Sequence, residues 1–133
     1  MDGLTLEIGI GKATAFSFAK HGASQLALAD INLPAAEKVS KEIESRFPGT
    51  KVIPLGIDVT KETSINDAVA ETAHRFGRID FAVNNAGIGG PASLSAEHSV
   101  EEWNKTISIN LHGVWMSSRA EIRTMLQQEK REE

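Results

Sequence analysis

A polar tetrapeptide, Asn-Asn-Ala-Gly at residues 84–87, is the part of the sequence best suited to hold a ligand. It follows a short apolar run at residues 81–83 and leads into a loop with glycine at positions 89 and 90. A continuous apolar run is typical of a strand covered on both faces, and open α/β sheets bind ligands beyond the carboxyl ends of their strands. Two side-chain amides and a glycine at such an end therefore predict a ligand site.

Two further patterns predict what that ligand is. Gly9 and Gly11 precede a helical pattern, and the N-terminus of a helix attracts phosphate through its free amides and its dipole. Asp30 ends an apolar run nineteen residues after Gly11, the position of an acid that accepts the ribose hydroxyls of NAD. The alternative for Asp30, an acid that begins the following loop, stays open on these residues alone.

The elements that would position these residues alternate between strand and helix. Apolar runs predict strands at residues 4–8, 26–29, 51–57 and 79–83, with helices between them. Pro54 favours an edge position for the third of these strands, because proline donates no ladder hydrogen bond. A capping box at Ser99 starts a long helix over residues 100–126. Such alternation is typical of βαβ units and a mostly parallel sheet, and no linker interrupts it, so we expect a single domain over residues 1–133.

Composition excludes several classes of function. A net charge of −4 offers no basic surface for nucleic acid or an anionic membrane. The chain has no cysteine, and its four histidines lack the spacing of metal ligands, so we expect no metal site. No apolar stretch approaches the ~20 residues that span a bilayer, and no signal pattern precedes the first helix, which predicts a cytoplasmic location.

In combination, the motifs resemble the N-terminal half of the short-chain dehydrogenase/reductase family. The resemblance runs from about residue 8 to about residue 128 and depends on the order and spacing of several short motifs. These are Gly9-Ile10-Gly11, Asp30, Asp58-Val59, Asn84-Asn85-Ala86-Gly87 and Asn110-Leu111-His112-Gly113. It implies a Rossmann-like, doubly wound parallel sheet and an oxidoreductase that uses NAD(P) on alcohols or ketones.

The resemblance also implies a role for each matching residue. A turn of Gly9, Ile10 and Gly11 would face the cofactor pyrophosphate, and Asp30 the adenosine ribose. The adenine would lie between Asp58 and Val59, while the nicotinamide ribose and the neighbouring strand would be supported by Asn84, Ala86 and Gly87. Asn110 matches the asparagine of the family's catalytic tetrad, which holds a water in the proton relay.

Charge around Asp30 favours NAD over NADP. Its carboxylate would repel a 2′-phosphate, and Ile31 and Asn32 supply no cation to bind one. Lys12, just after the glycine turn, weakly favours NADP instead, because it supplies a positive charge.

Two departures from the family pattern limit the expected activity. Thr5 stands where the family has its first glycine. Only about four residues remain for the first strand. In the family this strand lies centrally, between the strands that end here at Asp30 and Asn84. The chain also ends before the family's catalytic serine and Tyr-x-x-x-Lys pair, and it contains no tyrosine. We therefore expect an incomplete fold, truncated before these residues and inactive alone, because hydride transfer needs a proton partner.

Two alternatives to an active oxidoreductase follow. One is a non-catalytic module that binds the nucleotide. The other is a partner of a full-length relative, or of a second copy, that docks through the helix at residues 100–126.

Overall fold

The computed structural model describes residues 9–129, and the strand expected at residues 4–8 lies outside this range. The described elements alternate between helix and strand as far as α3, and only helices follow. They are α1 (Ile10–Lys20), β1 (Gln25–Asp30), α2 (Leu33–Arg46), β2 (Lys51–Gly56), α3 (Glu62–Phe76), the short η1 (Ser95–Glu97), α4 (Val100–Ile107), the π-helical η2 (Ser108–Gly113) and α5 (Val114–Gln127).

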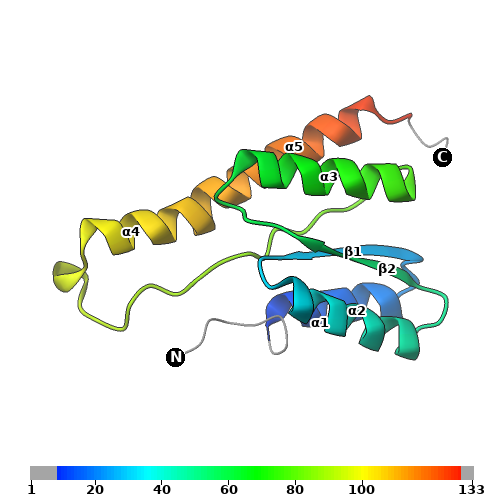
Figure 1. Cartoon of the computed structure of the whole chain (residues 1–133), viewed down its shortest axis with the longest axis horizontal. Helices are drawn as coiled ribbons and strands as arrows, with labels where there is room; N and C mark the ends of the chain where they lie inside the picture. Colours follow the sequence, from blue (N-terminus) through cyan, green and yellow to red (C-terminus); the bar gives the residue numbers. More distant parts are fainter. Residues whose placement is uncertain (1–8, 130–133) are drawn as a thin grey trace.

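The two strands form a parallel pair with helices on both faces. Gln25 pairs with Lys51 at one end of the ladder and Asp30 with Gly56 at the other. Helices α1 and α2 lie on one side of the strands and α3 on the other, with α5 beside α3 (Figure 1). This arrangement confirms an α/β fold of the Rossmann-like type as an incomplete fragment. Pro54 lies in β2, whose only strand partner within residues 9–129 is β1.

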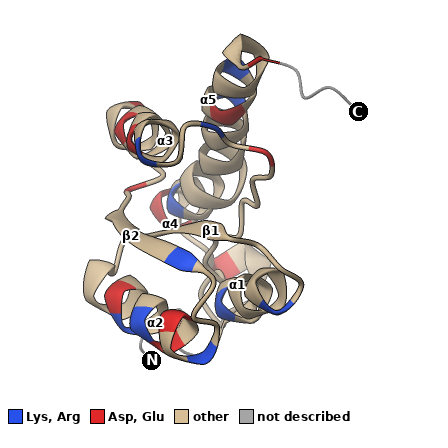
Figure 2. Cartoon of the chain, turned by 90° about the vertical axis from the view of Figure 1, so that its right-hand side faces the viewer, with Lys and Arg blue, Asp and Glu red and all other residues tan. Residues whose placement is uncertain are grey.

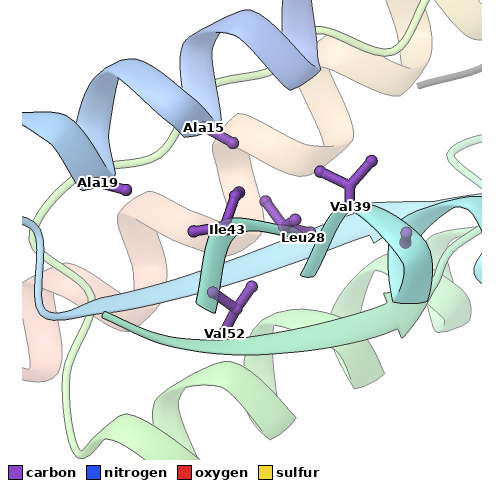
Figure 3. Close-up of a cluster of buried hydrophobic side chains, with 7 residues drawn as sticks. Ala15, Ala19, Leu28, Val39, Ile43 and Val52 are labelled. Carbon is purple, nitrogen blue, oxygen red and sulfur yellow. The ribbon is translucent and has the colours of Figure 1, made fainter. Parts of the chain in front are cut away.

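The main core lies between α1, α2 and the strands. The buried side chains of α1 are small, which allows this helix to approach the branched side chains of α2 and the strands closely. Its buried members are Ala15, Ala19, Leu28, Ala36, Val39, Ile43 and Val52 (Figure 3). On the opposite face of the sheet, α3 buries Ile65 and Ala68.

Side-chain caps fix where α2 and α4 begin. The Asn32 side chain accepts a hydrogen bond from the Ala35 N–H at 3.1 Å, which satisfies one free amide of α2. Ser99 and Glu102 form the complete capping box at the start of α4. Gly77 ends α3 with φ +79°, a left-handed conformation that favours glycine.

The predicted strand at residues 79–83 is wrong. These residues form no strand, and Phe81 is 80% exposed. A strand exists only when a neighbour completes its ladder, so apolar composition is insufficient by itself. Within the described range β1 pairs only with β2, and the strand that the family resemblance places between β1 and residues 79–83 lies outside that range.

The long helix predicted over residues 100–126 is present but contains an unpredicted π-helical segment, η2. Trp103 and Trp115 on this helix are 60% and 59% exposed, so neither is a core residue of the described chain. Acidic and basic side chains are mixed along α2 and α5 rather than separated by sign (Figure 2). None of the helices described is long and apolar enough to cross a membrane.

Candidate functional site

The first part of the site is the N-terminus of α1. Gly9 is the N-cap, with extended backbone at φ −88° and ψ 167°, and among residues 9–129 no side chain caps the helix. No acidic residue lies in the first turn of α1. Gly9, Ile10 and Gly11 thus present amide groups at a helix start, an arrangement that can bind a phosphate group.

Asp30 lies at the carboxyl end of β1 and is half-buried. Its Oδ1 atom accepts a hydrogen bond from the Asn32 N–H at 2.7 Å, so the carboxylate is held close to the start of α2. Ile31 beside it is 79% exposed and carries no charge. The position and the fixed orientation of Asp30 suit an acceptor for ribose hydroxyls. Neither of the next two residues, Ile31 and Asn32, carries a positive charge.

Asp58 organises the loop that follows β2. Its Oδ1 accepts the Thr60 hydroxyl at 2.6 Å and the Thr60 N–H at 3.0 Å, and Lys61 Nζ lies 3.1 Å from Oδ2. The Asp58 N–H also donates to Ser64 Oγ at 2.9 Å. The bonds from Thr60, followed by those from Lys61, lower the pKa of Asp58 below its ordinary value of 3.8. Val59 is therefore carried on a stiff turn.

The Asn-Asn-Ala-Gly loop is attached to the long helix rather than to the sheet. Asn84 Nδ2 donates to Ser118 Oγ at 3.1 Å and to Glu121 Oε2 at 3.0 Å. Both acceptors lie on α5, one helical turn apart. Ala86 and Gly87 are exposed at the end of the loop.

Asn110 makes the most specific contact of the site. Its Oδ1 accepts the Ile88 N–H at 2.9 Å, and its Nδ2 donates to the Ile88 carbonyl at 2.8 Å. A side-chain amide thus pairs with both backbone groups of one residue, as a neighbouring strand would. A Cβ added at Gly87 would lie 3.4 Å from Asn110 Oδ1, an ordinary van der Waals distance, so this contact does not itself require glycine.

Asn110 belongs to η2, where the helix is widened by one residue. Single π-helical turns occur frequently at functional sites because they redirect side chains out of the regular helical array. Here the turn directs the Asn110 amide at Ile88. Sequence reasoning identified Asn110 from the family motif but missed the π turn.

Sequence reasoning also missed Gln128, the C-cap of α5. The Gln128 Oε1 accepts the Ile79 N–H at 2.7 Å and its Nε2 donates to the Ile79 carbonyl at 2.9 Å. This repeats, at the start of the segment 79–88, the two-point contact that Asn110 makes at its end. No pattern in the sequence marks Gln128, because its partner is a backbone 49 residues away.

The structure thus places the candidate residues at the ends of regular elements, in loops and, for Asn110, within the π-helical η2. Gly9–Gly11 form the start of α1, Asp30 is the last residue of β1, Asp58 follows β2, and the loop at residues 84–88 is joined to Asn110. Within residues 9–129, no group of three His, Asp or Glu side chains is arranged to hold a metal ion.

The fold and these loops define an α/β protein of the Rossmann-like, dinucleotide-binding class. Comparison with known proteins gives the family: the model of the short chain dehydrogenase family matches residues 6–132. The chain belongs to the short-chain dehydrogenase/reductase family, as its motifs predicted.

Named relatives are oxidoreductases of this family. The chain is 42% identical over 115 residues to the short-chain dehydrogenase srdC of Neurospora crassa, covering 84% of this chain and 42% of the relative. It is 34% identical to levodione reductase of Leifsonia aquatica, covering 90% of this chain and 45% of that protein. The chain therefore spans less than half the length of these relatives.

Solved structures agree with this assignment. The crystal structure of levodione reductase superposes with a TM-score of 0.84 at 34% identity, over 88% of this chain and 45% of that one. An alcohol dehydrogenase from Thermococcus sibiricus, solved with 5-hydroxy-NADP, gives a TM-score of 0.80 at 34% identity over 87% of this chain and 48% of that one. A 3-ketoacyl-(acyl-carrier-protein) reductase from Brucella melitensis, solved with NADH, gives 0.73 at 31% identity over 86% and 43%.

The bonds around Asp58 predict a pH-dependent stability. Because its pKa is lowered on folding, Asp58 stabilises the fold above about pH 4, and this contribution is lost as the pH falls through the folded-state pKa. Asp58→Asn should lower the free energy of unfolding at neutral pH by on the order of 1 kcal/mol. In urea titrations the difference between wild type and variant should shrink below about pH 4.

The exposed Asp67 of α3 provides the control, since Asp67→Asn should leave unfolding nearly unchanged at every pH. A difference between wild type and Asp58→Asn that stays constant down to about pH 2 would show that the Asp58 charge contributes nothing.

Proposed function

We propose that this chain is the cofactor-binding half of a short-chain dehydrogenase/reductase and binds NAD in preference to NADP. The observation that carries the proposal is the pair of hydrogen bonds between the Asn110 side chain and the Ile88 backbone, which holds the end of the Asn-Asn-Ala-Gly loop without a strand ladder. Support comes from relatives whose structures contain 5-hydroxy-NADP or NADH.

In this proposal the pyrophosphate lies against the amides at the start of α1, and the dipole of that helix favours its charge. Asp30 accepts the ribose hydroxyls, Val59 and Asp58 flank the adenine, and the loop at residues 84–87 supports the nicotinamide ribose. The residues assigned to the cofactor are Gly9, Ile10, Gly11, Asp30, Asp58, Val59, Asn84, Ala86 and Gly87. Asn110 is assigned to the catalytic machinery, where its amide sets the position of the Ile88 backbone.

The same proposal holds that the 133 residues form one truncated domain that does not turn over substrate alone. The nicotinamide supplies or accepts a hydride when it is bound, and the substrate oxygen must exchange a proton in the same reaction. The family's Tyr-x-x-x-Lys pair is not among these residues, since they contain no tyrosine. The alcohol or ketone that the intact family oxidises or reduces therefore meets an incomplete set of groups.

Calorimetric titration of the purified chain with NAD and NADP tests the cofactor assignment. We expect tighter binding of NAD, because the Asp30 carboxylate repels a 2′-phosphate. Asp30→Ser should reduce the preference for NAD about tenfold, equivalent to ~1.4 kcal/mol. Asp67→Ser, a matched loss of an exposed carboxylate, should leave the preference unchanged.

Equal affinity for the two dinucleotides in the wild type would contradict the NAD assignment. Binding of neither at millimolar concentration would contradict the cofactor site itself. Steady oxidation of NADH with a panel of ketones by the purified chain would contradict the claim that it is inactive alone.

A second candidate function is association through the long helix, either with another copy or with a longer member of the family. Large apolar side chains along α4, η2 and α5 are exposed to an extent unusual for a free surface. They are Val100, Trp103, Leu111, Trp115, Ile122 and Leu126, with exposed fractions between 54% and 80%. Burial of this surface would remove apolar area from water and favour an oligomer.

Sedimentation velocity tests this second candidate. We expect the wild-type chain to self-associate, or to sediment with a longer relative when one is added. Ile122→Glu should weaken that association at least tenfold, because it places a charge in the contact. Leu94→Glu, which changes a 71% exposed leucine away from the helix, should not. A chain that sediments as a monomer at all concentrations, with or without the relative, contradicts association.

A further inference from the structure

Gly113, the last residue of η2, lies so close to the loop after β2 that a side chain there would require one of them to shift by a few tenths of an ångström. A Cβ added there would lie 3.0 Å from Val59 Cγ2, 3.1 Å from Val59 Cβ and 3.1 Å from the Val59 carbonyl oxygen. The carbonyl and Cβ belong to the loop itself and cannot rotate away. By contrast, nothing lies within 4 Å of a Cβ added at Gly49.

The backbone of Gly113 does not itself require glycine. Its φ of −59° and ψ of −46° are ordinary helical values. In such a conformation alanine favours a helix more than glycine does. The glycine therefore costs helical stability, and the contact with Val59 is the structural reason for it.

The loop that meets Gly113 is fixed on its other side. Asp58 binds Thr60 and Lys61, and its backbone N–H is held by Ser64 on α3. A methyl group on residue 113 must therefore displace either this stiff turn or the π turn. Neither can relax by rotation of a flexible side chain alone.

The π turn contacts a second loop through Asn110, three residues before Gly113. Asn110 holds the backbone of Ile88, as described above. One turn of helix thus contacts both the loop at residues 58–60 and the loop at residues 84–88. In the proposed function these loops serve opposite ends of the dinucleotide.

We propose that Gly113 is a positioning residue for the adenine end of the cofactor site. Its missing side chain seats the Val59 loop directly on the π turn that also holds Ile88, so this turn sets the spacing between the two loops. The proposal rests on the proposed function for its ligand, although the contact itself does not.

The test compares Gly113→Ala with Gly49→Ala, using AMP, nicotinamide mononucleotide and NAD as separate ligands in calorimetric titrations. Gly113→Ala should bind AMP and NAD about tenfold more weakly, because overpacking shifts the Val59 loop. Binding of nicotinamide mononucleotide should change less than binding of AMP, since the added methyl group meets Val59 and not Ile88. The Gly49→Ala variant should bind all three ligands as the wild type does.

Amide hydrogen exchange gives a readout that needs no ligand. The Thr60 N–H is held by Asp58, and it should exchange faster in Gly113→Ala but not in Gly49→Ala. If the wild type binds none of the ligands, the proposed function fails, while faster exchange at Thr60 still supports the contact. Wild-type AMP binding with unchanged exchange at Thr60 in a folded Gly113→Ala protein would overturn the proposal.

A compensating variant covers the case in which Gly113→Ala does not fold. Adding Val59→Gly removes two of the three atoms that the new methyl group meets. The double variant should recover folding and part of the Thr60 protection. Failure of the double variant to recover either would also overturn the proposal.

Discussion

The two hydrogen bonds between the Asn110 side chain and the Ile88 backbone are the contact on which the candidate site depends. In the segment from residue 79 to residue 88, no strand ladder satisfies the backbone groups or fixes their direction. A side-chain amide has one acceptor and two donors, so it can take the place of a neighbouring strand at a single residue. Each such bond contributes about 0.5–1.5 kcal/mol net, but leaving a partly buried group unpaired costs more.

The long helix acts as the support for this segment along its whole length. Gln128 holds Ile79, Ser118 and Glu121 hold Asn84, and Asn110 holds Ile88. The long helix is itself fixed by α3. The small residues Ser117 and Ala120 of α5 are buried where the two helices pack together. Arg119 of α5 also forms an ion pair with Glu62 of α3. Since α3 also packs against β1, the sheet positions α3, α3 positions α5, and α5 positions the loop at residues 84–88.

Much of the fold could be predicted from local sequence signals. Asn32 and Ser99 cap the helices that follow them, Gly77 ends α3, and Ala36, Val39 and Ile43 recur at the helical spacing of a buried face on α2. These signals succeed because the residues that cause them lie within a few positions of the feature they determine. The family motifs added Asp30, Asp58 and Asn110, whose places in the site follow from resemblance rather than from local physics.

The features that sequence reasoning missed depend on distant contacts. The apolar residues 79–83 are a strand only if another strand lies beside them, and this cannot be read from the residues themselves. Gln128 and the π turn at Ser108–Gly113 are likewise defined by what they touch. No sequence signal marks the contact of Gly113 with Val59 either.

Hydrogen exchange at the Ile88 amide tests the central claim most directly. In the wild-type chain this amide should exchange slowly, and Asn110→Ala should accelerate it about fivefold or more, which corresponds to the loss of ~1 kcal/mol. The Ile79 amide, held by Gln128, should remain unchanged in the same sample. Equal exchange at Ile88 in the wild type and in Asn110→Ala would show that Asn110 does not hold the loop.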